Sequence, residues 1–204
     1  MNEADLNARL KELYQPPAND FVLVDVPEMR YIMIDGRGAE DRAALEHART
    51  WLFAVIQPIR PIVKARMGKH FVEPPLECLW WADDAHDFVR AEKSTLRWRM
   101  MIVFEPDWLT AEVFDDGVAQ ATSRLGEPPS SLRLERHHEG LSAQIMFVGP
   151  NRETGPVIAR LHTEFLPARQ LTPNGRHHEI YLNDPSRVAP EKVKTVLRQP
   201  VRAE

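Results

Sequence analysis

The chain has 204 residues, of which 43% are hydrophobic and 27% are charged, a composition typical of a soluble globular protein with a substantial core. This composition excludes intrinsic disorder, collagen and a coiled coil as the main architecture. The formal net charge is −4 at pH 7, and no basic stripe runs along the chain. Since nucleic-acid binders carry a basic excess, we expect no nucleic-acid partner.

Cysteine usage and the apolar segments indicate where the protein resides. Cys78 is the only cysteine, so no intrachain disulfide can form, and a reducing compartment is expected. The N-terminal segment has no apolar core of the kind that signal peptides carry. The longest apolar runs, 51–56 and 100–104, fall far short of the roughly 20 residues that span a bilayer. We therefore predict a cytoplasmic protein without a membrane partner.

The first half of the sequence predicts two helices and four strands. An amphipathic helix within residues 1–20 carries Leu6, Leu10 and Leu13 on one side and ends at Pro16 and Pro17. The elements that follow are a strand at 21–27, a strand at 29–38, a helix at 40–58, a strand at 75–81 and a strand at 95–106.

The second half repeats this alternation. A helix at 107–126 has Asp107 or Thr110 as its N-cap and Gly126 at its end. The elements that follow are a hairpin of 131–140 with 141–150, a helix at 152–171, a strand at 176–185, a short helix from Ala189 and a closing strand at 195–201.

The order of elements contains an internal repeat. The segments that begin at Ile32 and Ile145 both show a strand, a glycine turn and a helix, and each is followed by a strand with a central glutamate, Glu77 or Glu179. We predict an α+β fold of duplicated strand-helix-strand-strand modules with pseudo-two-fold symmetry. The expected boundaries are one domain over 1–204, repeat 1 over about 21–106 and repeat 2 over about 131–201. Chance similarity of two amphipathic units is the alternative.

Strand alternation predicts where the two glutamates point. Glu179 and Tyr181 share one face of their strand, and Glu77 and Trp81 share one face of theirs. If the apolar faces pack under the helices and the modules pair about a two-fold axis, both glutamates line one groove. Aromatic walls with acidic groups favour flat rings and cations.

Several alternatives compete with this interpretation. Each glutamate could instead form a surface salt bridge with a nearby arginine, namely Arg97, Arg99, Arg176 or Arg198. Only His177 and Glu179 of the second His-His-Glu string could share a metal, and two ligands do not make a zinc site, so we predict no metal and no cofactor. Cys78 lies on the apolar face of its strand and is expected to be an inert buried thiol. Trp98 is a core residue or, beside the Glu77 strand, a ligand contact.

Five strings resemble the GyrI-like (gyrase-inhibitor-like) small-molecule-binding family in its stand-alone bacterial form. They are LVDVPEMRYIMIDGRG, PLECLWW, WRMMIVFEPDWLT, HHEGLSAQIMFVGP and HHEIYLNDPSRVAPEKVKTVLRQPV, and they cover the chain from about 13 to 201. The resemblance implies a duplicated fold with a central ligand cleft. It also implies that relatives sense drugs, inhibit gyrase, bind aromatic or cationic compounds, or hydrolyse cyclopropane-bearing alkylators.

The resemblance assigns the ligand contacts residue by residue. The glutamate that the family places in its cleft maps to Glu179, and that of the other strand maps to Glu77. The remaining ligand-binding candidates are Trp80, Trp81, Trp98 and Tyr181. The sequence departs from the family pattern at Cys78, Phe147 and Asn151, where the family has glycine, histidine and tyrosine.

We therefore predict a binder of flat hydrophobic or cationic xenobiotics in an aromatic, glutamate-lined cleft. The alternative is a hydrolase in the same cleft, with Glu179 as general base and Tyr181 as its catalytic partner. A macromolecule-docking protein is less favoured, because the chain lacks a long charged tail. A transcription regulator is disfavoured, because about 20 residues before the first strand are too few for a DNA-binding domain.

Overall fold

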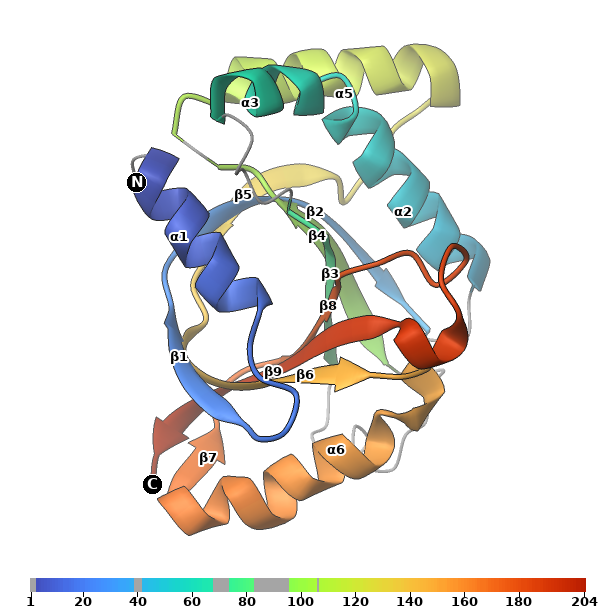
Figure 1. Cartoon of the computed structure of the whole chain (residues 1–204). Coiled ribbons are helices and arrows are strands. Elements are labelled where there is room, and N and C mark those ends of the chain that lie inside the picture. Colours follow the sequence, from blue (N-terminus) through green and yellow to red (C-terminus); the bar gives the residue numbers. More distant parts are fainter. Residues whose placement is uncertain (1–2, 39–41, 68–73, 83–95, 106) are drawn as a thin grey trace. The chain divides into compact units, whose positions relative to one another are not determined.

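The computed structural model describes residues 3–38, 42–67, 74–82, 96–105 and 107–204 (Figure 1). The fold is α+β with antiparallel strands, as the sequence predicts. The chain forms two compact units. Unit 1 comprises Met1–Leu10, Met29–Pro74 and Trp80–His137, and unit 2 comprises Lys11–Glu28, Pro75–Leu79 and His138–Glu204.

Unit 1 is built around the strand β2 (Met29–Arg37). This strand pairs antiparallel with β4 (Arg97–Val103) on one side and with β5 (Arg133–His137) on the other. Among the described residues, the helices of unit 1 are the first part of α1 (Glu3–Tyr14), α2 (Arg42–Ile56), α3 (Arg60–Met67) and α5 (Ala111–Leu125). Trp51, Leu52 and Val55 of α2 are buried, so the apolar side of this helix supplies the core, as its sequence spacing predicts.

Gly36 permits a close packing contact in unit 1. An added Cβ at this position would lie 2.0 Å from Cζ2 of Trp98, whose side chain is buried. We therefore expect Gly36→Ala to lower the free energy of unfolding by about 1–3 kcal/mol, the usual cost of overpacking a core. Chemical denaturation measures this loss. Gly155→Ala is the matched control, since an added Cβ there meets nothing within 4 Å, and equal stability of the two variants would contradict the prediction.

Unit 2 contains a second group of paired strands. In order across the sheet they are β1 (Val22–Val26), β6 (Gly140–Val148), β9 (Lys194–Ala203), β8 (His177–Tyr181) and the first part of β3 (Leu76–Trp81), and β7 (Leu171–Pro173) also pairs with β9. The helical elements with residues in unit 2 are the end of α1 (Glu3–Tyr14), η1 (Asn151–Glu153), α6 (Gly155–Arg160), η2 (Leu161–Phe165), η3 (Pro167–Arg169) and η4 (Pro190–Lys192). Figure 1 shows the α6 segment lying along β6 and β9.

The two faces of the unit 2 sheet differ in character. Ile145 and Leu197 are register partners, and both belong to an apolar cluster with Leu161 and Phe165 of the helical segment. The neighbouring register partners, Gln144 and Arg198, are polar and buried. Since adjacent residues of a strand point to opposite faces, one face packs on the α6 segment and the other carries buried charge.

The expected hairpin of 131–140 with 141–150 is wrong. β5 pairs with β2, and β6 pairs with β1 and β9. The two-residue connection of His138 and Glu139 leads from β5, which adds to the edge of β2 in unit 1, to β6, which lies between β1 and β9 in unit 2. Glu139 is buried there and contacts His178 and Arg198.

Four other elements differ from the predictions. The expected helix at 152–171 is a broken series of η1, α6, η2 and η3, because η2 is a π-helix and Pro167 begins a new turn. The helix α3 and the strand β7 were not predicted. The short helix expected from Ala189 is the single turn η4.

The element order strand-strand-helix-strand-strand occurs twice, as β1-β2-α2 with β3-β4 and as β5-β6-α6 with β8-β9. The first strand of each half pairs with the second strand of the other half, β1 with β6 and β5 with β2. A duplication with two-fold symmetry would produce this exchange, and the symmetry itself stays a prediction.

Candidate functional site

Unit 2 contains a chain of buried polar side chains on the face of its sheet opposite α6. We call it the buried charge cluster. Its members are Tyr14, Glu77, Glu139, Gln144, His178 and Arg198. They come from α1, β3, the β5–β6 connection, β6, β8 and β9, so segments far apart in the sequence supply one network.

His178 lies at the centre of the cluster between two carboxylates. Its Nδ1 is 3.0 Å from Oε1 of Glu139, and its Nε2 is 2.9 Å from Oε2 of Glu77. The hydroxyl of Tyr14 donates a hydrogen bond to Oε1 of Glu77. A carboxylate beside each ring nitrogen favours the imidazolium, which donates from both nitrogens.

Arg198 is the second cation of the buried charge cluster and contacts Glu139. Its guanidinium donates to Oε2 of Glu139 at 2.9 Å and to Oε1 of Gln144 at 3.0 Å. A third bond of 2.8 Å goes to the carbonyl oxygen of Leu13 in the last turn of α1. A cation at a helix C-terminus satisfies carbonyls that have no partner within the helix. The cluster therefore holds the end of α1 against the sheet.

The charges of the cluster balance when His178 is protonated. Burial alone would raise the pKa of Glu139, but His178 and Arg198 outweigh it and hold that pKa well below its usual range. Burial alone would lower the pKa of His178, but Glu139 and Glu77 outweigh it and raise that pKa. Two buried anions thus face two buried cations, the arrangement that makes burial of charge tolerable.

The opposite face of β8 carries a second polar group, which we call the Glu179 trio: His177, Glu179 and Tyr181. The Tyr181 hydroxyl donates to Oε2 of Glu179 at 2.8 Å. Nε2 of His177 is 3.8 Å from Oε1 of Glu179, an ion-pair distance only if His177 is protonated. The Glu179 side chain is 15% exposed, whereas that of Glu77 is 0% exposed. The Glu179 side chain is therefore partly open to water, whereas that of Glu77 is closed off.

The expectation that Glu77 and Glu179 line one groove is wrong. Glu77 contacts His178, and His178 shares a face with its register partner Arg198. Glu179 follows His178 in the strand and shares the opposite face with Leu197. The repeat alignment placed the two glutamates as equivalents, but Glu77 lies on the face of His178. An offset of one residue in a strand reverses the side chain.

Residues 19–202 match the GyrI-like small molecule binding domain. The chain belongs to the GyrI-like family. This assignment covers nearly all of the described structure and confirms the resemblance found in the sequence. No curated protein matches the chain.

Solved structures agree with the family assignment. An uncharacterized conserved protein from Listeria innocua is 32% identical, with a TM-score of 0.81 over 97% of this chain and 98% of that one. A hydrolase from Listeria innocua is 32% identical, with a TM-score of 0.76 over the same shares. The C-terminal domain of EcmrR is 8% identical with a TM-score of 0.60, over 91% of this chain and 98% of that domain, which shows a shared fold alone.

The three tryptophans proposed as ligand contacts belong to unit 1. Trp98 is 2% exposed, and its indole N–H donates to the carbonyl oxygen of Gly38 at 3.3 Å, so it is a core residue of unit 1. Trp80 and Trp81 are half-buried. Among the described residues, the buried Nε1 of Trp80 has no hydrogen-bond acceptor.

The three departures from the family pattern have structural roles. Cys78 is a buried thiol, as expected, and its Sγ lies 3.7 Å from the carbonyl oxygen of Leu79. Phe147 packs against the apolar cluster under α6. The Asn151 side chain accepts a hydrogen bond of 3.0 Å from the hydroxyl of Thr195, and so connects η1 to β9.

Sequence reasoning missed most of the buried charge cluster. It assigned none of four members to a site, namely Tyr14, Glu139, His178 and Arg198. The signal was present in the two His-His-Glu strings, whose members His178 and Glu139 are hydrogen-bonded partners. The strings were considered only as possible metal ligands, so the hydrogen bond between their members was not predicted.

In the part of the chain that the structure describes, no three histidine, cysteine or acidic side chains are arranged to hold a metal ion. No described helix has the length and apolar character needed to cross a bilayer.

The cluster predicts a pH dependence of folding stability. The pKa of Glu139 is lowered on folding, so its stabilisation is present above the ordinary glutamate pKa of 4.5 and is lost as the pH falls through the lowered folded value. The pKa of His178 is raised, so its stabilisation is complete below 6.5 and is lost as the pH rises through the raised folded value. Tyr14, Glu77, Gln144 and Arg198 are the other groups that face this pair. Both contributions to the free energy of unfolding are complete between pH 4.5 and pH 6.5.

Thermal unfolding followed by circular dichroism from acid to alkaline pH measures this dependence. His178→Gln is the control, since it removes the titrating imidazole and leaves Glu139 in place. We expect the alkaline decline in melting temperature to be smaller in the variant. An equal decline in melting temperature with rising pH in the two proteins would contradict the assignment of this decline to His178.

Proposed function

We propose that this GyrI-like protein binds flat hydrophobic or cationic small molecules beside Glu179 and hydrolyses those that carry a strained electrophilic ring. The observation that carries the proposal is the partly exposed Glu179 side chain, whose carboxylate accepts a hydrogen bond from the Tyr181 hydroxyl. A general base must accept a proton from water, and a positioned carboxylate does so. The likeness of the full chain to a protein described as a hydrolase supports turnover in addition to binding.

The reaction balances without a cofactor. Glu179 accepts a proton from water while the water oxygen forms a bond to a ring carbon. The carbon–carbon bond of the ring breaks, and its electron pair moves into a conjugated carbonyl group. The resulting enolate takes up one proton from solvent and Glu179 releases one to solvent, so the net change is the addition of one water. Tyr181 holds the carboxylate in one orientation through its hydrogen bond.

Glu77 is less suited to this role. Its carboxylate is closed off from solvent, faces the His178 imidazolium and accepts the Tyr14 hydroxyl. Its two oxygens are already engaged by Tyr14 and His178, and its side chain is 0% exposed, so no water reaches it. We therefore propose that Glu77 organises unit 2 and that Glu179 reacts.

Incubation of the protein with a cyclopropane-bearing alkylator tests the proposal. Chromatography with mass detection should find a product heavier by one water, formed over many turnovers. Loss of the alkylator in a stoichiometric amount without product would support binding alone and contradict the hydrolase. No loss and no binding would contradict both parts of the proposal.

A further inference from the structure

The outer edge of strand β1 in unit 2 is open and apolar. β1 pairs with β6 on one side, and no other described strand pairs with it. Leu23 in β1 and Leu141 in β6 are 44% and 41% exposed. The register partner of Leu23 is Ala143, which belongs to the apolar cluster under the α6 segment, and Leu141 lies two residues from Ala143. Both leucines are therefore on the α6 face, at a corner that the helical segment leaves uncovered.

The edge strands of the two units differ in their protection. Natural sheets usually blunt an edge strand with charged side chains, which hinder pairing with another chain. The edge strand of unit 1, β5, carries Arg133, Glu135 and Arg136. β1 has the sequence VLVDV, in which Asp25 is the one charged residue. An apolar edge of this kind is a template for the addition of another strand.

The register of β6 shows which backbone groups of β1 point outward. The N–H of Gly149 donates to the carbonyl of Val193 at 2.8 Å, in continuation of the pairing of β6 with β9. Odd-numbered residues of β6 therefore bond to β9, and even-numbered ones bond to even-numbered partners in β1. The N–H and C=O groups of Leu23 and Asp25 consequently point away from β6, toward the free edge.

We propose that β1 pairs antiparallel with β1 of a second copy of this chain, about a two-fold axis at Leu23. A two-fold axis makes a single surface complementary to itself. The two Leu23 residues exchange two hydrogen bonds, and the N–H of each Asp25 donates to the carbonyl of Phe21 of the other copy. The N–H of Phe21 already donates to Oδ1 of Asp20 at 2.8 Å, so Phe21 contributes its carbonyl alone.

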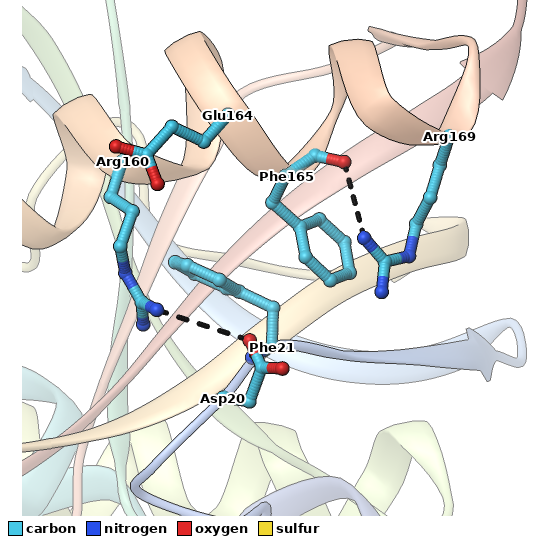
Figure 2. A pocket seen from close by; sticks show the side chains of 6 residues that line it. All are labelled: Asp20, Phe21, Arg160, Glu164, Phe165 and Arg169. Atoms are coloured by element: carbon cyan, nitrogen blue, oxygen red, sulfur yellow. Dashed lines mark hydrogen bonds and ion pairs between the residues drawn. The ribbon is translucent and has the colours of Figure 1, made fainter.

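This pairing brings opposite charges together. Asp25, Leu23 and Phe21 share one face of β1, and in this register Asp25 lies opposite Phe21 of the second copy. The guanidinium carbon of Arg160 is 4.8 Å from the centre of the Phe21 ring, and Figure 2 shows it beside Asp20. The ion pair with Asp20 is long, at 3.9 Å, and the Arg160 side chain is 39% exposed. Asp25 of each copy therefore meets Arg160 of the other, at two places related by the axis.

Two other two-fold registers use the same outward groups and are less favourable. An axis at Asp25 places the two carboxylates directly opposite each other, which is destabilising. An axis at Val24 places the exposed side chain of Leu23 opposite Asp25. The axis at Leu23 joins the exposed leucines and gives each acid a basic partner.

Sedimentation equilibrium of the full-length protein, from about 1 µM to about 1 mM, tests the proposal. We expect the mass to rise from that of one chain toward that of two, with a Kd on the order of 100 µM, because the paired surface is at the small end of protein interfaces. Amide hydrogen exchange locates the contact. Exchange at Leu23 should slow as the concentration rises, whereas Val24, which bonds to β6, should be protected throughout. A protein that stays monomeric at the highest concentration would overturn the proposal.

A lysine at the axis separates this edge from other surfaces. Leu23→Lys should raise the dissociation constant at least about tenfold, because two like charges then meet at the axis. Val148→Lys is the matched control, since Val148 is 46% exposed and lies on the opposite face of the same sheet. Equal dissociation constants for these two variants would overturn the proposal.

Charge reversal tests the register. Asp25→Arg and Arg160→Asp should each weaken the dimer about tenfold or more, since like charges then face each other at two places. The double variant restores opposite charges and should recover most of the affinity. Melting temperatures verify that each variant folds. A folded double variant that binds no better than the single variants would overturn the pairing of Asp25 with Arg160 and the axis at Leu23.

Discussion

Glu139→Gln is expected to destabilise the protein by about 3–5 kcal/mol, the cost of removing one partner of a buried ion pair. The substitution leaves Arg198 and the His178 imidazolium without the carboxylate that both contact at 2.9–3.0 Å. Two buried cations then face only Glu77. For a chain of this length, the melting temperature should fall by about 6–20 °C.

Thermal and chemical denaturation measure this loss. Glu135→Gln is the matched control, because Glu135 pairs with Arg133 and is 45% exposed, and such pairs contribute about 0–1 kcal/mol. A double variant with Arg198→Met should lose less stability than the sum of the single variants, since both members of the pair are then gone. A loss below about 1 kcal/mol for Glu139→Gln would contradict a stabilising role of the cluster.

Glu179→Gln is expected to lower the rate of ring opening by about 10²–10⁴-fold, the usual contribution of a positioned general base. The amide has the shape of the carboxylate but does not accept the proton of the attacking water. Tyr181→Phe should have a smaller effect of about 10–100-fold, since it removes one hydrogen bond to a charged group. Initial rates of product formation, normalised to the folded fraction, measure both effects.

Glu77→Gln serves as the control for this series. It should lower the melting temperature through the buried charge cluster and leave the rate of each folded molecule within a few-fold of the original. A rate loss in Glu77→Gln equal to that in Glu179→Gln would contradict the assignment of the base.

Much of the fold could be predicted from the sequence because its signals are local. The spacing of Trp51, Leu52 and Val55 predicts α2, and alternation together with glycine turns predicts most of the strands. Strand pairing is not local. β5 and β6 are adjacent in the sequence, yet each pairs with a strand more than 100 residues away. The buried contacts beside β6 are equally distant in sequence, since Glu139 meets His178 and Arg198.

The site was predictable in part for the same reason. Alternation correctly places Glu179 and Tyr181 on one face of β8, where they are hydrogen-bonded. The relation of Glu77 to Glu179 depends on the face that β3 presents beside β8, and an error of one residue in a repeat alignment reverses it. The buried cluster depends on six segments meeting in unit 2, which neither periodicity nor motif spacing encodes.

A crystal structure of the protein with a bound, unreactive analogue of the strained-ring substrate tests the central claim most directly. Our account predicts that the electrophilic carbon lies beside the Glu179 carboxylate, with a water molecule between them and Tyr181 still donating to that carboxylate. An analogue that displaces Tyr14 and contacts Glu77 or His178 would contradict it.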